Sequence, residues 1–148
     1  MKKLLVIAAT IVATTFSITS QAQFAKPEAA VKYRQSAMFI MAQHFGRVGA
    51  MVQGKVPFDA KVAQENIDTA VFMSKLPWAG FVAGADSKAA KPEIWTDNAK
   101  FKDLSEKMQA QLLKVQAAAK TGSLDNIKAS FGAAGGSCKA CHDAFRNE

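Results

Sequence analysis

Cysteine and histidine are scarce in this sequence, and their scarcity limits the sites that it can build. Among 148 residues there are two cysteines, Cys138 and Cys141, and two histidines, His44 and His142. His44 lies far from the cysteines and at no zinc-finger spacing, and a zinc site would need further ligands. The cysteines are three residues apart and share one short motif, which leaves no cysteine for a structural disulfide elsewhere.

Runs of like charge and strand-like patterns are also missing. The chain carries 19 basic and 12 acidic residues, for a formal net charge of +7. The charges are interspersed and form no block of five or six of one sign, so nucleic-acid binding has little support. No alternating strand pattern precedes the cysteines, and no internal repeat or low-complexity segment is present.

The first 22 residues have the pattern of a secretory signal peptide. A basic start is followed by an apolar run over residues 4–18 and by Ser20-Gln21-Ala22. This order, with small residues at the −3 and −1 positions, predicts cleavage after Ala22 and export to the periplasm. An uncleaved anchor is the alternative, but threonines and a serine interrupt the run, which is short for a span of about 20 residues.

Residues 23–148 are then the mature domain, which is long enough for one core. Removing Lys2 and Lys3 leaves 17 basic and 12 acidic residues, so its net charge is +5. We expect no membrane insertion of this part.

The tail of the chain contains the motif Cys138-Lys139-Ala140-Cys141-His142. Cys-x-x-Cys-His is the attachment signature of c-type haem. Two thiols three residues apart can form thioethers with the two vinyl groups of one porphyrin, while the adjacent imidazole binds the iron. The motif therefore predicts one haem c per chain, attached covalently through Cys138 and Cys141, with His142 as the proximal iron ligand.

Other interpretations of the same residues remain open. A thioredoxin-like Cys-x-x-Cys redox pair would be expected near a βαβ pattern, which is missing here. A zinc site lacks further ligands. The motif could also occur by chance in a protein without haem, although the export signal favours haem.

Four amphipathic helices are predicted, each bounded by capping or helix-breaking residues. They run from Pro27 to Gly54, from Asp59 to Leu76, from Thr96 or Asp97 to Gly122, and from Ser123 through Phe145. A long connection, Trp78 to Ile94, separates the second from the third. The pattern predicts an all-α fold, an antiparallel up-and-down four-helix bundle with the covalently bound haem in its core, near the end of the last helix.

Polar and apolar residues off the expected pattern point to further contacts. Arg34 takes an apolar position of the first helix, with Gln35 beside it, and this inward-facing pair needs a partner such as a haem propionate; the alternative is that both are solvated. Phe39, Ile40 and Met51 lie off the apolar stripe, which suggests self-association. Gly135-Gly136 interrupts the helical pattern of the last segment and indicates either close approach of the backbone or the porphyrin, or a kink.

The whole mature chain resembles the cytochrome c′ family, a standard example of the up-and-down bundle. Besides the haem motif and the arginine that follows it, the resemblance rests on four internal stretches, Tyr33-Arg34-Gln35-Ser36-Ala37, His44-Phe45-Gly46-Arg47, Leu76-Pro77-Trp78 and Pro92-Glu93-Ile94-Trp95. It implies a homodimer packed largely through the first two helices. It also implies an iron bound by His142 on one side and by no protein ligand on the other.

The resemblance assigns further residues to the haem. Met38 matches the distal position, Arg34 and Gln35 match positions near the haem edge and propionates, and Arg146 matches an arginine beside the proximal histidine. Such proteins bind small gases, nitric oxide especially, and also pass electrons. The family more often has a bulky hydrocarbon at the position of Met38.

The resemblance thus implies a five-coordinate, high-spin haem that binds nitric oxide and carbon monoxide or carries electrons to an unidentified redox partner. The alternative is a six-coordinate, low-spin electron-transfer cytochrome with Met38 as the distal ligand. Met41 and His44 are also possible distal ligands by residue type, but His44 belongs to a stretch found in five-coordinate relatives. We expect no enzyme, because no second histidine and arginine are placed to cleave an O–O bond.

Overall fold

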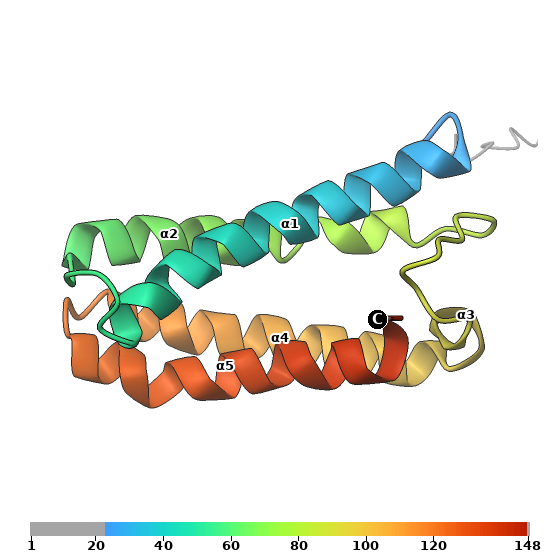
Figure 1. Cartoon of the computed structure of the whole chain (residues 1–148). Helices are drawn as coiled ribbons and strands as arrows, with labels where there is room; N and C mark the ends of the chain where they lie inside the picture. Colours follow the sequence, from blue (N-terminus) through green and yellow to red (C-terminus); the bar gives the residue numbers. More distant parts are fainter. Residues whose placement is uncertain (1–22, 148) are drawn as a thin grey trace, which may run out of the picture.

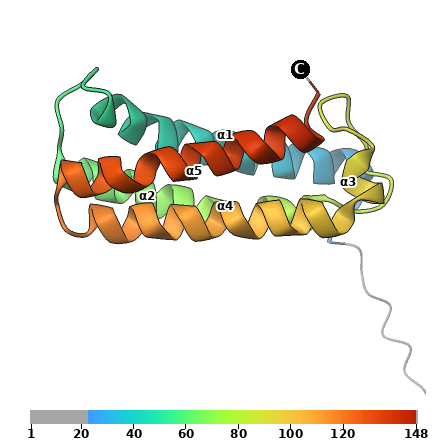
Figure 2. The same ribbon diagram turned by 90° about the horizontal axis from the view of Figure 1, so that it is seen from below.

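The computed structural model describes residues 23–147, so the predicted signal peptide lies outside the described residues. Four long helices lie side by side in alternating directions (Figures 1 and 2). They are α1 (Pro27–Val52), α2 (Ala60–Met73), α4 (Asn98–Ala119) and α5 (Leu124–Phe145). The prediction of an all-α, up-and-down four-helix bundle is confirmed. Among the helices of residues 23–147, none is both long and apolar enough to cross a lipid bilayer.

The turns at one end of the bundle follow local signals in the sequence. The Asp59 carboxylate accepts a hydrogen bond of 2.9 Å from the Val62 amide at the start of α2. Ser123 Oγ accepts one of 3.3 Å from the Asn126 amide at the start of α5. Gly122, with φ near +70°, follows α4 in the left-handed conformation that glycine adopts without strain. The predicted helix boundaries at this end are confirmed.

The connection between α2 and α4 is more ordered than a loop. It contains a 3-10 turn, η1 (Pro77–Gly80), and a short helix, α3 (Glu93–Thr96). Asp97 stands at the N-cap position of α4 as predicted, but its side chain makes no capping hydrogen bond. Residues 88–91 run beside the C-terminal residues of α5, where Ala90 and Arg146 form an isolated antiparallel bridge.

Two hydrophobic clusters fill the bundle. The main core cluster draws on all four long helices and includes the fully buried side chains Val48, Ile67, Leu112, Val115 and Ile127. A smaller aromatic cluster, built on Ile94, Phe101 and Phe145, lies where α3 meets the end of α5. Phe101 packs edge to face on Phe145 in this second cluster, at a centroid distance of 5.2 Å.

Helices α1 and α5 approach each other at one level of the bundle. The Phe45 and Phe131 rings stack there, with centroids 4.2 Å apart and an interplanar angle of 4°. Figure 1 shows α1 running obliquely, so that its N-terminal half is drawn apart from the C-terminal half of α5. These two halves face the same end of the molecule.

Helix α5 continues through Gly135 and Gly136 without ending there. Two details differ from the sequence-based expectation. Met51 is buried in the main core cluster with 7 % of its surface exposed, because the C-terminal half of α1 is covered on more than one side. Gln35 is exposed rather than turned inward, although its neighbour Arg34 is buried.

Candidate haem site

The two cysteines lie half-buried near the end of α5, where the two hydrophobic clusters meet. Cys138 packs against the main core cluster, and Cys141 packs against the aromatic cluster. Both thiols are free of disulfides. Burial raises the pKa of the Cys138 thiol, against the effect of a backbone hydrogen bond, and burial together with Cys138 raises the pKa of Cys141. The thiols are therefore protonated at neutral pH.

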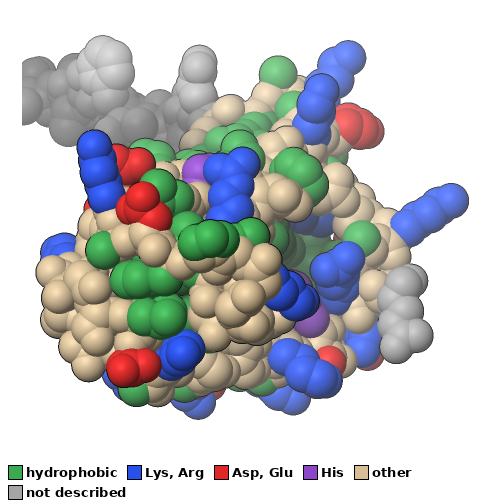
Figure 3. Space-filling view, turned by 60° about the vertical axis from the view of Figure 1, so that its left-hand side comes forward, with side chains coloured by type: hydrophobic (Ala, Val, Ile, Leu, Met, Phe, Trp, Pro, Cys, Tyr) green, Lys and Arg blue, Asp and Glu red, His purple; other side chains and the backbone are tan. Residues whose placement is uncertain are grey.

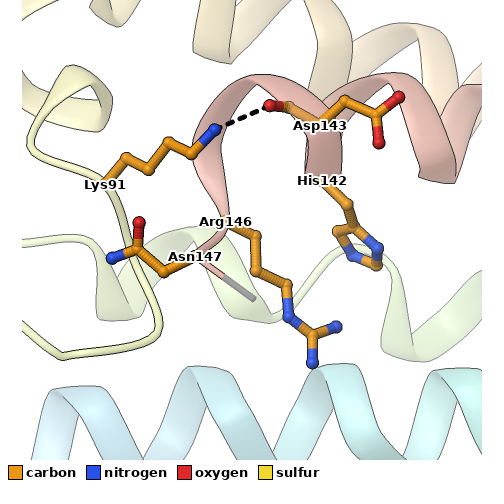
Figure 4. A pocket seen from close by; sticks show the side chains of 5 residues that line it. All are labelled: Lys91, His142, Asp143, Arg146 and Asn147. Carbon is orange, nitrogen blue, oxygen red and sulfur yellow. Dashed lines mark hydrogen bonds between the residues drawn. The ribbon is translucent and has the colours of Figure 1, made fainter.

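His142 lies on the last turn of α5, and Arg146 directly follows the end of the helix. Both side chains project from α5 toward α1 (Figure 4). They line a cavity of about 630 Å³ together with Lys91, Asp143 and Asn147. Its size falls within the range of about 300–1,000 Å³ that is usual for small-molecule and cofactor sites. In Figure 3 a recess has hydrophobic side chains at its bottom, with lysine, arginine and histidine side chains at its edge.

The surroundings of His142 favour its neutral form. Desolvation lowers the pKa of the imidazole, the positive charge of Arg146 lowers it further, and the Asp143 carboxylate acts in the opposite direction. A neutral imidazole has a free ring nitrogen that can bind a metal. His142 is thus already in the protonation state that an iron ligand requires.

The residues present fit a covalently bound haem. Two thiols and an imidazole lie within five residues of α5: His142 lines the cavity, Cys138 packs against the main core cluster, and Cys141 packs against the aromatic cluster. A Cβ added at Gly132, Gly135 or Gly136 would meet no atom from elsewhere in the described chain within 4 Å, so the space beside α5 at these positions is open. Lys91 and Arg146 supply positive charge at the cavity for the propionates. Cys138 and Cys141 would hold the group and His142 would bind its iron.

Arg34 is buried, with 2 % of its surface exposed, as its position on the apolar stripe predicted. Its guanidinium donates hydrogen bonds to the Gly80 carbonyl at 2.8 Å and to Ser87 Oγ at 3.3 Å. It also lies 4.4 Å from the centroid of the Phe81 ring. Burial lowers the pKa of Arg34 and the Asp86 carboxylate raises it. The partners that satisfy this charge come from the connection between α2 and α4.

Met38 and His44 lie on different sides of α1. Met38 is half-buried and comes one turn after Arg34. The His44 ring instead contacts α2, where its Nδ1 lies 2.9 Å from Oδ1 of the buried Asn66. Asn66 in turn donates to the Val62 carbonyl at 2.7 Å. The His44 ring is therefore engaged between α1 and α2.

Sequence reasoning missed three residues of the cavity: Asp143, which directly follows the haem motif, and two that lie outside any motif, Lys91 and Asn147. Lys91 donates from its ammonium to the Asp143 carbonyl at 2.8 Å (Figure 4). Asn147 donates from its side-chain amide to the Lys88 carbonyl at 2.9 Å. Neither residue belongs to a motif, and the partners are more than 50 residues apart in the chain, so no local pattern could have identified them.

Comparison with known proteins places these features in a family. The family described as Cytochrome C′ matches residues 29–146. Cytochrome c′ of Alcaligenes xylosoxydans xylosoxydans is 50% identical over 126 residues, which cover 85% of this chain and 99% of the relative. Cytochrome c′ of Rubrivivax gelatinosus is 51% identical over 129 residues, which cover 85% of this chain and 100% of the relative.

Solved structures agree with the sequence matches. The crystal structure of cytochrome c′ from Rubrivivax gelatinosus matches with a TM-score of 0.81 and 52% identity, covering 84% of this chain and 100% of the other. A nitric oxide complex of a leucine-to-alanine mutant of cytochrome c prime from Alcaligenes xylosoxidans matches with a TM-score of 0.81 and 49% identity. That match covers 85% of this chain and 99% of the other.

Proposed function

This chain belongs to the cytochrome c′ family, and from that premise we propose that it is a periplasmic monohaem protein that binds nitric oxide and carbon monoxide. The family implies a covalently attached haem c, which supplies an iron centre for gases and electrons when bound. We assign its attachment to Cys138 and Cys141. Solved nitric oxide complexes of a relative at 49% identity support the choice of ligand.

The observation that carries this proposal is the placement of His142 on the cavity that faces α1. In the proposed arrangement His142 binds the iron from the α5 side and the α1 side carries no protein ligand, which gives a five-coordinate, high-spin iron. Met38 guards the α1 side as an apolar side chain. Oxygen binding gains from distal hydrogen-bond donors, whereas nitric oxide and carbon monoxide bind ferrous iron without them, so an apolar distal side favours the latter.

Charged residues around the cavity serve the iron and the propionates in this proposal. Arg146, one turn after His142, favours the reduced iron through its positive charge, so Arg146→Ala should lower the midpoint potential. An unchanged potential would contradict that role. Arg34 uses two of its five guanidinium N–H donors on Gly80 and Ser87, which leaves donors for a propionate. Gln35, being exposed, could reach a propionate only at the haem edge.

We propose a homodimer formed by α1 and α2. Large apolar side chains are exposed on both helices, with Phe39 at 64 % and Ile40 at 39 % on α1, and Phe72 at 62 % and Val62 at 39 % on α2. Burying such side chains is the usual driving force of association. A chain that remains monomeric at micromolar concentration in analytical ultracentrifugation would contradict the dimer.

The proposed role is binding and electron transfer rather than catalysis, with a redox partner that is unidentified. His142 and Arg146 line the cavity, and in the proposed arrangement Met38 is the apolar side chain on the α1 side. Without a distal acid–base pair, cleavage of an O–O bond has no obvious proton donor. Steady-state turnover of peroxide well above that of free haem would contradict this assignment.

The experiment that tests the coordination is spectroscopic. We would record absorption and electron paramagnetic resonance spectra of the ferric and ferrous holoprotein, and then add nitric oxide to the ferrous form. A high-spin iron that takes up the gas is the expected result. Low-spin iron in both oxidation states, with the charge-transfer band of a methionine ligand, would contradict it.

A second candidate is a six-coordinate electron-transfer cytochrome in which Met38 binds the iron. Its support is the half-buried thioether on α1, one turn from the buried Arg34. The variant Met38→Leu separates the two candidates because it keeps an apolar side chain of similar volume and removes the sulfur. An unchanged high-spin spectrum supports the open site, and conversion from low spin to high spin supports the methionine ligand.

A further inference from the structure

The C-terminus of α5 is held by a distant segment rather than by a cap of its own. An α-helix leaves its last carbonyl groups without intrahelical partners. Helix α5 ends at Phe145, and Arg146 takes an extended conformation instead of the left-handed one of a glycine cap. The partners come from residues 88–91 of the connection between α2 and α4, which pair with residues 145–147.

Lys91 caps the last turn of α5 twice. Its backbone amide donates to the Phe145 carbonyl at 2.9 Å. Its side-chain ammonium donates to the Asp143 carbonyl at 2.8 Å. A cation at this position also opposes the negative end of the helix dipole. The two carbonyls belong to the residues that directly follow His142 and precede Arg146.

Asn147 makes the reciprocal contacts. Its backbone amide donates to the Ala89 carbonyl at 3.1 Å, and its side-chain amide donates to the Lys88 carbonyl at 2.9 Å. Each residue thus gives both its backbone and its side-chain donor to the opposite segment. We call these four hydrogen bonds the clamp.

The segment that bears the clamp is also tied to α1. Arg34 on α1 donates to the Gly80 carbonyl and to Ser87 Oγ, one residue before the clamp begins. Residues 80–91 therefore run from the helix on one side of the cavity to the end of the helix on the other side. Because α1 and α5 diverge at this level (Figure 1), this connection determines how the last turn of α5 lies relative to α1.

We propose that Lys91 and Asn147 are positioning residues, which hold the last turn of α5 against residues 88–91 so that His142 faces the cavity at a fixed angle. The inference rests on His142 binding the haem iron, as proposed above. The clamp restrains the backbone on the C-terminal side of His142, and the attached cysteines restrain it on the N-terminal side. The imidazole is then held between two fixed points.

The test compares Lys91→Met and Asn147→Ala holoproteins with the wild type by resonance Raman spectroscopy of the ferrous form. The iron–histidine stretching band reports the orientation and strain of the imidazole. We expect this band to shift and broaden in both variants. Lys91→Arg keeps a cationic donor and should show the wild-type band. If Lys91 acted through packing alone, the Lys91→Arg and Lys91→Met variants would show the same band.

The matched control is Lys88→Met. Lys88 is an exposed neighbour that enters the clamp through its backbone carbonyl, so this variant removes one nearby charge and leaves the clamp bonds in place. Its band should equal that of the wild type. A band that shifts equally in Lys88→Met and Lys91→Met would overturn the proposal. The shift would then come from the loss of a positive charge near the haem and not from the loss of a clamp hydrogen bond.

Hydrogen exchange gives a second readout that does not depend on iron coordination. Losing one hydrogen bond of ordinary strength should accelerate exchange of the clamp amides at positions 91 and 147 about fivefold in either variant. Faster exchange with an unchanged iron–histidine band overturns the positioning role. If the wild type shows no iron–histidine band, the five-coordinate iron of the proposed function is wrong. In that case the exchange data alone test the clamp. Faster exchange at residues 142–146 in Lys91→Met supports its positioning role, and unchanged exchange there overturns it.

Discussion

The two ends of the bundle are built in different ways. At one end, which we call the turn end, residues 53–59 and 120–123 join neighbouring helices. At the other, the site end, residues 77–97 and 142–147 surround the cavity. The turn end is bounded by residues that act on their immediate neighbours, such as the Asp59 and Ser123 caps. The site end is held by bonds between residues far apart, 46 residues for Arg34 to Gly80 and 52 for Lys91 to Asp143.

This difference between the two ends explains why a cofactor site can form at the site end. Local caps bound the helices at the turn end, and the main core cluster, to which all four long helices contribute, packs them together. The site end has a smaller cluster and a cavity, and its helices are held together by side chains from a long connection. A cofactor placed there replaces packing that the polypeptide itself does not supply. We therefore expect substitutions at the turn end to change the free energy of unfolding without changing the iron spectra.

The largest expected effect is at the turn end. Ile127, fully buried in the main core cluster, lies in the first turns of α5. Ile127→Ala should lower the free energy of unfolding by about 4 kcal/mol, because the cavity left behind adds to the lost burial. Urea denaturation of the holoprotein measures this loss. The haem spectra should stay unchanged under native conditions, and a changed iron spectrum would show that the two ends are not separate.

A glycine at the site end should give the next largest effect. A Cβ at Gly80 would lie 2.6 Å from the Ala30 carbonyl oxygen and 2.9 Å from Arg34 Cβ. Gly80→Ala must therefore push η1 away from α1, at a cost of about 3 kcal/mol. Gly122→Ala is the matched variant at the turn end, where φ of +70° costs about 1 kcal/mol and a new Cβ meets only Ala60 Cβ at 4.0 Å. Equal losses in thermal denaturation would contradict the close approach at Gly80.

Removing the buried charge should cost less. Arg34→Met fills a similar volume but leaves the Gly80 carbonyl without its partner, which predicts a loss of about 2 kcal/mol. Amide exchange within residues 80–91 should accelerate, since these residues lose their attachment to α1. Arg47→Met, an exposed arginine on the same helix, should change stability by less than about 0.5 kcal/mol. Unchanged exchange in Arg34→Met would show that the connection is held without Arg34.

The same contrast explains what the sequence could predict. The turn end carries its signals within a few residues, so Asp59, Gly122 and Ser123 located the helix boundaries correctly. The haem motif is also local, since three reactive side chains fall within five positions. The error at Gln35 is geometric: adjacent residues on a helix point about 100° apart, so Gln35 could not face inward together with Arg34.

The rest of the site depends on contacts that leave no local pattern. Helix α3 and the turn η1 lie in a stretch that the sequence indicated only as a long connection. Lys91 and Asn147 acquire their places when residues 88–91 meet the end of α5, and a lone lysine or asparagine is otherwise an ordinary surface residue. Met51 lies off the apolar stripe of α1, which suggested self-association, yet it is buried within the same chain by the main core cluster.

The smallest expected effect compares two aspartates that the sequence presents as equivalent helix caps. Asp59 accepts a hydrogen bond from the Val62 amide at 2.9 Å, whereas the side chain of Asp97 makes no capping bond. Asp59→Ala should therefore lower the free energy of unfolding by about 1 kcal/mol, and Asp97→Ala should change it by less than about 0.5 kcal/mol. Chemical denaturation of both variants measures the difference. Equal losses would mean that α4 begins with a local cap after all, and that the site end is less dependent on long-range bonds than its hydrogen bonding indicates.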